Sequence, residues 1–383
     1  MHRNLKVTEG PLSCEAVYYK YLDGKAKQVD PVEFDNVANA IAEKFFNIDG
    51  LTLRDYLPRP HEPMRYPEVY AKYDRLSVQD RLDQLDFSDE DKATFATLTG
   101  GFGQSHARDV GFMEAAMWFA RVGGTNAGIN EYCSTYKIGN GGTTSLARAI
   151  LSDFDGDIVV NAPVAEIAQD SQIVKVTLRD SRQVKARYLI CTIPLNVLKN
   201  IRFQPPLSQL KTEAATPGVI TKGTKYHFEF AQPQAHFFAG ATFDSPFGFT
   251  WSDHHGKQNN HTYSIGFGNG GQLMNIKDSK QVISSYQQLF PQPAEISGYA
   301  IHDWRDDEFA LSGWACFGPG CASRYLRALQ EPHGDRVFMA SADWADGWRG
   351  FIDGAIEQGT RNARRVIGLL RRPTAANRLR ARM

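Results

Sequence analysis

The fold is decided by the stretch Arg336-Val337-Phe338-Met339-Ala340-Ser341-Ala342-Asp343 and by the glycine-rich stretch soon after it, Gly347-Trp348-Arg349-Gly350-Phe351-Ile352-Asp353-Gly354-Ala355. Residues 337–340 form an apolar run that predicts a strand, and residues 354–370 predict a helix. Free N–H groups at the start of a helix stabilise an anion, and glycine lets the backbone approach it closely. The two stretches therefore indicate an α/β domain with an anion-binding helix end.

The segment from residue 137 to residue 270 is predicted to be rich in strands. Residues 139–142 (Gly-Asn-Gly-Gly) predict a turn, and residues 143–152 predict a short helix. Strands are expected at five places, of which the first is a buried strand and the second a half-exposed one: residues 158–161, 173–178, 184–192, 224–230 and 261–267.

Residues 1–136 are predicted to be mostly helical. Pro31 to Phe46 carries apolar residues at helical spacing, and Asp30 stands where the N-cap belongs. Shorter helices are expected over residues 78–85 and 89–98, the second opened by Ser88 and an acidic first turn. The basic tail, residues 371–383, is expected to be disordered.

Composition excludes several classes of protein. The chain has 383 residues, of which 42% are hydrophobic, enough to bury the cores of two domains. Lys plus Arg equals Asp plus Glu at 43 each, so no net charge favours nucleic acid or an acidic membrane surface. No signal peptide and no apolar run of about eighteen residues occurs. We therefore expect an intracellular, cytoplasmic protein that binds neither nucleic acid nor a membrane.

The five cysteines are too scattered for a disulfide framework, and they are expected to be reduced thiols: Cys14, Cys133, Cys191, Cys316 and Cys321. Cys316 and Cys321 stand closest together, but no His or Cys near them completes a ligand set. No metal site is expected. The run Gly266-Phe267-Gly268-Asn269-Gly270-Gly271 matches GxGxxG, yet no acidic residue and no long apolar helix follow where a nucleotide site needs them. A glycine-rich hairpin or loop is the simpler interpretation.

Three segments together resemble the flavin-containing amine oxidase superfamily, which includes monoamine and polyamine oxidases. The first is residues 141–207, with Val159-Val160-Asn161-Ala162-Pro163-Val164 and Ile201-Arg202-Phe203-Gln204-Pro205-Pro206. The resemblance implies the middle part of an FAD-binding domain, in which the backbone around Val164 lies against the adenine.

The second segment is residues 222–230, Lys-Gly-Thr-Lys-Tyr-His-Phe-Glu-Phe, followed by Pro233. It is similar to the strand that carries the family's flavin-facing lysine, which holds a water molecule near flavin N5. Lys222 and Lys225 compete for this role, and the spacing to Pro233 favours Lys225. The alternative is an ordinary solvent-exposed lysine on a strand.

The third segment runs from Trp304 through Gly313-Trp314 to the stretches quoted first. It resembles the family's closing motif, whose helix points its N-terminus at the flavin. The resemblance implies cofactor contacts from Asp343, Gly350, Ile352, Gly354 and Ala355. It also implies that Trp314 and Phe351 flank the substrate amine, where aromatic faces exclude water and tolerate a cation. Alternatively, both rings are ordinary core aromatics.

The resemblance begins in the middle of the family's fold. The family's opening strand, GxGxxG turn and helix do not occur before Met1, a segment of roughly seventy to a hundred residues. Without it FAD would lose its charged anchor, and the sheet would keep unpaired edges. Three explanations stay open: another polypeptide supplies the segment, the reading frame is truncated, or the fold no longer uses FAD.

The resulting prediction is an α/β FAD-binding domain that lacks its N-terminal βαβ unit, interleaved with an α+β substrate domain. The expected segments are a helical substrate part, a middle FAD-binding part, a sheet-forming substrate part, a C-terminal FAD-binding part and the tail: residues 1–136, 137–210, 211–312, 313–370 and 371–383.

The implied function is an FAD-dependent amine oxidase that passes hydride from the amine-bearing carbon to flavin N5, with reoxidation by dioxygen. The alternative is a protein without FAD, used for non-redox catalysis or binding. The expected partners are a small amine and, for the incomplete domain, a second chain or another copy. Four aromatic residues could either line the substrate cavity or belong to the packed core: Tyr70, Trp118, Phe119 and Trp251.

Overall fold

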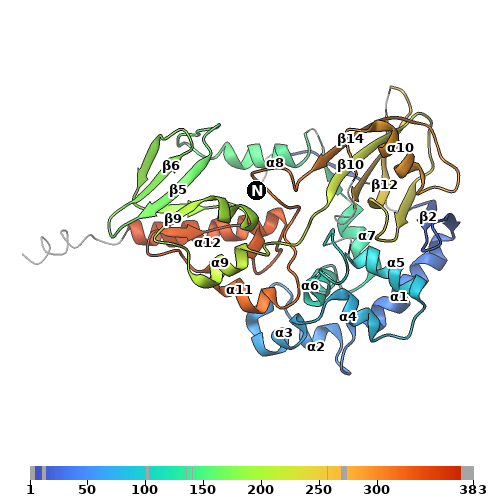
Figure 1. The fold of residues 1–383 in the computed structure, drawn as a ribbon, viewed down its shortest axis with the longest axis horizontal. Coiled ribbons are helices and arrows are strands. Elements are labelled where there is room, and N and C mark those ends of the chain that lie inside the picture. Colours follow the sequence, from blue (N-terminus) through green and yellow to red (C-terminus); the bar gives the residue numbers. More distant parts are fainter. Residues whose placement is uncertain are drawn as a thin grey trace, which may run out of the picture. The chain divides into compact units, whose positions relative to one another are not determined.

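The computed structural model describes residues 5–10, 14–100, 103–134, 136–139, 141–256, 258–268 and 274–371. The chain forms two compact units, each made of two segments. Unit 1 comprises residues 1–160 and 220–320, and unit 2 comprises residues 161–219 and 321–383. Figure 1 shows their elements in sequence colours.

Unit 1 contains the helices of the N-terminal half and one helix that lies in the chain between two strands of the main sheet. They are α1 (Pro31–Phe46), α2 (Leu53–Tyr56), η1 (Pro63–Arg65), α3 (Pro67–Asp74), α4 (Val78–Asp83), α5 (Asp89–Gly100), α6 (Phe112–Arg121), α7 (Asn126–Ser134), α8 (Gly142–Leu151) and α10 (Ser279–Gln287). The predicted start of α1 is confirmed, because the Asp30 carboxylate accepts hydrogen bonds from the backbone N–H groups of Val32 and Glu33. The short helices α4 and α5 begin where the sequence places them.

A seven-stranded sheet forms the centre of unit 1, in the order β14-β10-β13-β12-β11-β2-β3. Its strands are β2 (Ala16–Lys20), β3 (Ala26–Val29), β10 (Thr224–Phe230), β11 (Phe237–Ala241), β12 (Phe247–His255), β13 (Thr262–Gly268) and β14 (Ile296–Asp303). Only the β11–β2 pair is parallel, and the other neighbours are antiparallel. A separate antiparallel pair joins β1 (Val7–Glu9) to β4 (Tyr136–Ile138).

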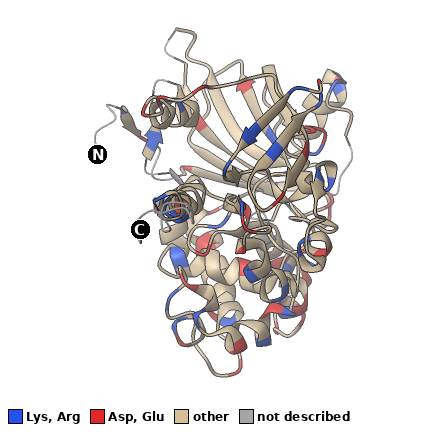
Figure 2. Ribbon diagram, turned by 90° about the vertical axis from the view of Figure 1, so that its left-hand side faces the viewer, with Lys and Arg blue, Asp and Glu red and all other residues tan. Residues whose placement is uncertain are grey.

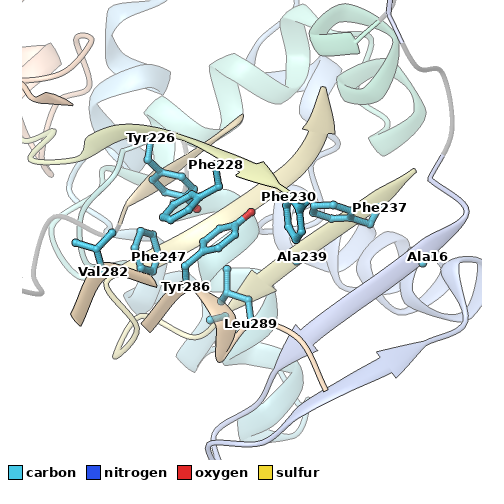
Figure 3. Close-up of a cluster of buried hydrophobic side chains, with 11 residues drawn as sticks. Ala16, Tyr226, Phe228, Phe230, Phe237, Ala239, Phe247, Val282, Tyr286 and Leu289 are labelled. Atoms are coloured by element: carbon cyan, nitrogen blue, oxygen red, sulfur yellow. The ribbon is translucent and has the colours of Figure 1, made fainter. Parts of the chain in front are cut away.

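The alternation along β10 gives the sheet two different faces. Tyr226, Phe228 and Phe230 are buried on one face, where they pack against Tyr286 of α10 (Figure 3). The rings of Phe228 and Tyr286 stack with centroids 3.6 Å apart. Burial of this aromatic cluster removes a large apolar area from water and fixes the sheet on α10. Lys225, which directly precedes Tyr226, therefore lies on the opposite face.

Unit 2 contains two smaller sheets and the long C-terminal helix. One sheet has the order β7-β6-β5-β9, and the other is the parallel pair β15–β8. Its elements are β5 (Val164–Gln169), β6 (Val174–Leu178), β7 (Gln183–Ala186), β8 (Leu189–Cys191), η2 (Leu195–Asn200), β9 (Arg202–Gln204), α9 (Gln209–Ala215), α11 (Cys321–Gln330), β15 (Val337–Met339), η3 (Ala342–Trp344) and α12 (Ile352–Leu370).

One predicted strand is wrong. Residues 158–161 form no strand, and Ile158, Val159 and Val160 expose 56%, 61% and 72% of their surface. A run of β-branched residues becomes a buried strand only where neighbouring strands accept its backbone hydrogen bonds. None of the described strands pairs with this run.

Two other strand predictions need correction. The single strand expected over residues 184–192 is divided into β7 and β8, which belong to different sheets. Residues 1–136 are helical for the most part, but they also supply β2 and β3 to the main sheet. β3 pairs with β2, and β2 in turn pairs with β11, which lies more than two hundred residues later in the chain and leaves no local signal near β2.

Charges of both signs are interspersed along the described elements, as the balanced composition predicts (Figure 2). Within the described residues, no helix combines the length and the apolar character that crossing a bilayer requires. Cys14, Cys191, Cys316 and Cys321 form no disulfide. Two predictions lie outside the described residues: the disordered tail beyond Arg371 and the last three glycine-run positions, 269–271. Gly266 and Gly268 belong to β13.

Candidate active site

Lys225 lies among aromatic rings on the sheet face opposite the α10 core. Its Nζ atom is 3.5 Å from the centroid of the Phe267 ring and 5.7 Å from that of Trp251. Phe267 is the direct cross-strand neighbour of Lys225 in the β10–β13 register, so the two side chains share one face. The competing Lys222 is exposed and precedes β10. The site thus surrounds one amine with ring faces.

Trp314 belongs to the same cluster. Its ring meets Phe267 edge-on, with centroids 4.9 Å apart and an interplanar angle of 84°. The Thr221 hydroxyl donates a hydrogen bond to the backbone oxygen of Trp314, which fixes the segment that carries the ring. We call Lys225, Trp251, Phe267 and Trp314 the aromatic site.

Burial lowers the pKa of Lys225 to about 7, and the negative charge of Asp253 opposes this shift. A large share of the Lys225 side chains is therefore uncharged at neutral pH. An uncharged amine can accept a hydrogen bond as well as donate one, so it can hold a water molecule or take up a proton.

Asp253 on β12 anchors the polar end of this face. Its carboxylate accepts a hydrogen bond from Lys137 at 2.5 Å, and the Nδ1 atom of His254 lies 2.7 Å from it. Burial raises the pKa of Asp253, but the contacts from Lys137 and His254 outweigh that effect and leave the pKa below its ordinary value. Asp253 is thus a fixed negative charge on the strand that carries Trp251.

The remaining predicted residues belong to unit 2. Phe351 is the N-cap of α12, and its ring meets Trp348 edge-on at 5.2 Å. Gly350 adopts a φ of +81°, which favours glycine. A Cβ at Gly354 would lie 2.2 Å from the backbone oxygen of Trp348, so only glycine fits there. These glycines fold the 347–351 loop tightly against the first turn of α12.

Asp343 lies in η3 and accepts a hydrogen bond from the backbone N–H of Leu195 at 2.7 Å. Burial raises the pKa of its carboxyl, against the lowering effect of this hydrogen bond. Val164 opens β5 and pairs with Leu178, so it belongs to a different sheet from the β15 strand that precedes Asp343.

The residues present in unit 2 fit the cofactor that the resemblance implies. The N-cap residue of α12, Phe351, makes no side-chain hydrogen bond to the first turn of the helix, which begins at Ile352. Such a helix start can donate to the anionic edge of a flavin ring. Ile352 and Ala355 are exposed on that first turn, which leaves their surface open to a ligand.

The structure also places the four aromatic candidates. Tyr70 is buried among the helices, with its hydroxyl 3.5 Å from Glu114, and Phe119 stacks on Phe46 at 4.1 Å. Trp118 is half-buried on α6. Of the four, Trp251 is the one that contributes to the aromatic site. Sequence reasoning missed Phe267, because it stood inside the glycine run, although the alternation of residues 262–268 marks it as a neighbour of Lys225.

Comparison with known proteins agrees with this geometry. Residues 3–367 match the family of flavin-containing amine oxidoreductases, and the chain belongs to that family. It is 30% identical to pseudooxynicotine dehydrogenase of Pseudomonas sp over 97% of the chain and 73% of the relative. Nicotine dehydrogenase of Pseudomonas putida is also 30% identical, over 96% of the chain and 74% of the relative. Human amine oxidase [flavin-containing] B is 22% identical over 80% of the chain and 61% of that relative.

Solved structures show the same fold. Putrescine oxidase bound to putrescine superposes with a TM-score of 0.77 at 17% identity, covering 96% of this chain and 84% of that one. Cyclohexylamine oxidase from Brevibacterium oxydans gives a TM-score of 0.73 at 17% identity, covering 97% and 84%. The predicted membership of the flavin-containing amine oxidase superfamily and the amine oxidase-like fold are confirmed.

Proposed function

We propose that this chain oxidises a C–N bond of a small amine with FAD as its redox cofactor and dioxygen as the final acceptor. The observation that carries the proposal is the aromatic site, where the Lys225 amine lies against Phe267 and Trp251 and burial lowers its pKa to about 7. The family membership supports the same reaction class, as do the relatives, which include pseudooxynicotine dehydrogenase, nicotine dehydrogenase and putrescine oxidase bound to putrescine.

In this proposal the residues of unit 1 bind the amine substrate and orient it. Trp251, Phe267 and Trp314 exclude water and accept a cationic or polarised amine on their ring faces. The Lys225 amine holds a water molecule and takes part in moving a proton, because its pKa lies near neutral pH. The flanking role that the resemblance assigns to Trp314 together with Phe351 stays a prediction.

The residues of unit 2 would hold the cofactor. The start of α12, with Gly350, Ile352, Gly354 and Ala355, would face the flavin, Asp343 would accept hydrogen bonds from its hydroxyl-bearing chain, and the backbone at Val164 would face the adenine. When bound, FAD would supply the hydride acceptor that no amino-acid side chain provides. Unit 1 is thus the proposed substrate domain and unit 2 the proposed FAD-binding domain.

We also propose that unit 2 is completed by a further β-strand segment, carried by a second chain or another copy. Within the described residues the parallel sheet has only the strands β8 and β15, whereas parallel sheets are covered on both faces. Four apolar side chains of α12 are exposed: Ile352, Ile356, Ile367 and Leu370. An added segment would pair the free sheet edge and cover these side chains.

The reaction is tested by amine turnover with Lys225→Met and with the exposed-lysine control Lys280→Met. We expect the purified chain with FAD to consume dioxygen when a small primary or secondary amine is added. Loss of general acid–base help costs about 10²–10⁴-fold, so Lys225→Met is expected to lose at least about 10²-fold in kcat, while the control keeps its rate. Equal rates for Lys225→Met and the wild type would remove Lys225 from the reaction.

A further inference from the structure

A cavity of about 180 Å³ lies in unit 1, apart from the aromatic site, between α1, α5 and the β2–β3 hairpin. Its floor and walls are largely apolar and include Phe34, Ile41 and Phe95, while Tyr21, Glu33 and Asp91 supply the polar part of the lining. A dry cavity of about 150 Å³ is enough for benzene, so this one has room for a single ring with a short substituent.

The two charged side chains that line the cavity are both acidic. Glu33 and Asp91 line it, and in the described part of the chain neither carboxylate makes an ion pair with Lys, Arg or His. A third carboxylate, Glu90, accepts a hydrogen bond from the Leu22 N–H at the same end of the hairpin. Burial raises the pKa of Tyr21, and the charges of Glu90, Glu33 and Asp91 raise it further. These carboxylates therefore act together on one hydroxyl at the cavity.

The aromatic lining is suited to a cation as well. Lys27 already places its Nζ atom 5.0 Å from the Tyr21 ring centroid, which shows that this ring is accessible to a positive group. Tyr19, fully buried, packs against Tyr21 at 5.1 Å and against Phe34 at 5.8 Å. Its hydroxyl interacts with the side chains of Thr97 and Thr94, and Thr94 belongs to the lining. An apolar floor, ring faces and two carboxylates that form no ion pair within the described residues together favour a small organic cation.

We propose that this cavity is a second binding site of the protein, and that it takes a protonated amine carrying a single ring. The ammonium group is placed at Glu33 and Asp91, and the ring lies on the apolar floor between Phe34 and Phe95. Charge-assisted hydrogen bonds to two carboxylates supply selectivity for the cation over a neutral molecule of the same shape.

A row of rings connects this cavity with the aromatic site. Phe34 lies 6.1 Å from Phe238, Phe238 lies 6.3 Å from Phe249, and Phe249 lies 6.0 Å from Trp251. All of these rings belong to unit 1. The second site and the aromatic site are therefore joined by ring contacts within one unit, and we expect both to bind the same class of molecule. That the bound amine is also a substrate rests on the proposed function, whereas the site itself does not.

A second cavity in unit 1 provides an internal comparison. It measures about 220 Å³ and is lined by one carboxylate, Glu43, together with the amides Asn39 and Asn47. The rings of Phe46 and Phe119, which also line it, stack with their centroids 4.1 Å apart. A larger space with a single carboxylate lacks the convergent charge of the first cavity. Glu43 on the same helix as Glu33 is therefore the matched control position.

Binding is measured by isothermal titration and by NMR saturation transfer on the full chain, with benzylammonium chloride as the probe and benzyl alcohol as its neutral counterpart. For so small a ligand a Kd of about 1 mM is expected. The double variant Glu33→Gln, Asp91→Asn is expected to weaken binding at least about tenfold, and Glu43→Gln to leave it unchanged. Benzyl alcohol is expected to bind at least about tenfold more weakly than the cation.

Two further variants separate the cavity from the aromatic site. Ala38→Leu fills the cavity, since Ala38 is a buried lining residue, and is expected to abolish binding there while α1 stays helical by circular dichroism. Trp314→Ala is expected to retain binding of benzylammonium in the cavity. Binding that survives Ala38→Leu but is lost in Trp314→Ala would overturn the proposal. A chain that binds benzylammonium in this cavity yet oxidises no amine would refute the proposed function and leave the second site standing.

Discussion

The two units differ in how completely their sheets are satisfied. In unit 1 the seven-stranded sheet has one face sealed by α10, with Tyr226, Phe228 and Tyr286 fully buried. In unit 2 the described parallel sheet has two strands, and α12 exposes four large apolar side chains. The arrangement around Lys225 is thus held by a buried core, whereas three of the proposed cofactor-binding residues, Ile352, Gly354 and Ala355, lie on a helix that exposes apolar side chains.

This difference shows which contacts hold the residues of each proposed site in place. Lys225 and Phe267 are opposed by strand register, so their geometry follows from the same hydrogen bonds that build the sheet. The start of α12 is fixed more locally, by Gly350 and by the contact of Gly354 with Trp348. Three sets of substitutions probe these two kinds of support.

The largest loss is expected from truncating the unit 1 core. Phe228→Ala removes a ring that stacks on Tyr286 at 3.6 Å, and is expected to lower the free energy of unfolding by about 3–5 kcal/mol. Ile367→Ala on the exposed side of α12 is its counterpart in unit 2, with an expected change within about 1 kcal/mol. Urea denaturation followed by circular dichroism measures both. Equal losses would mean that the exposed side of α12 is covered in solution.

A smaller loss is expected at the tight turn before α12. Gly354→Ala would place a methyl group 2.2 Å from the Trp348 oxygen, so the turn must shift, at an expected cost of about 1–3 kcal/mol. Gly359→Ala on the same helix meets no atom within 4 Å, and is expected to stabilise by up to about 1 kcal/mol. Melting temperatures of the two variants give the comparison. An unchanged melting temperature for Gly354→Ala would show that the 347–351 loop does not pack against Gly354.

The third prediction concerns the pH dependence of stability. Because the folded pKa of Lys225 lies near 7, below its ordinary 10.5, the unfolded chain binds more protons between these two values. Stability therefore rises as the pH increases through this window. Lys225→Met removes this contribution, so it is expected to exceed the wild type in melting temperature at pH 7 and below, and to lose that advantage towards pH 10.5.

Lys280→Met on α10 controls for the loss of one positive charge in that experiment. A melting-temperature difference between Lys225→Met and the wild type that does not change with pH would contradict the burial of Lys225. In that case the aromatic site would be an ordinary packed surface.

Sequence reasoning predicted the local elements well where a local signal exists. The Asp30 cap, the Ser88 start of α5 and the alternation of residues 224–230 are all encoded by neighbouring residues. It failed where distant pairing decides the outcome. The sequence near β2 carries no signal for its parallel partner β11. The sequence around residues 158–161 likewise does not reveal that the described strands leave this run unpaired.

The candidate site was predictable in part for the same reason. Lys225 and Trp314 came from the family resemblance, and the structure places both in the aromatic site. Phe267 and Asp253 were missed, since their roles depend on cross-strand register and on Lys137 from β4. The acid-lined cavity of α1 and α5 could not be inferred, because it exists only where two helices and a hairpin meet.

The most direct test of the account is a titration of the purified chain with FAD, followed by visible absorbance before and after anaerobic addition of an amine. We predict close to one bound FAD per chain, and loss of the oxidised-flavin absorbance when the amine is added. A folded chain that stays colourless at saturating FAD would contradict the proposed oxidation. The aromatic site would then be a binding site for amines without redox chemistry.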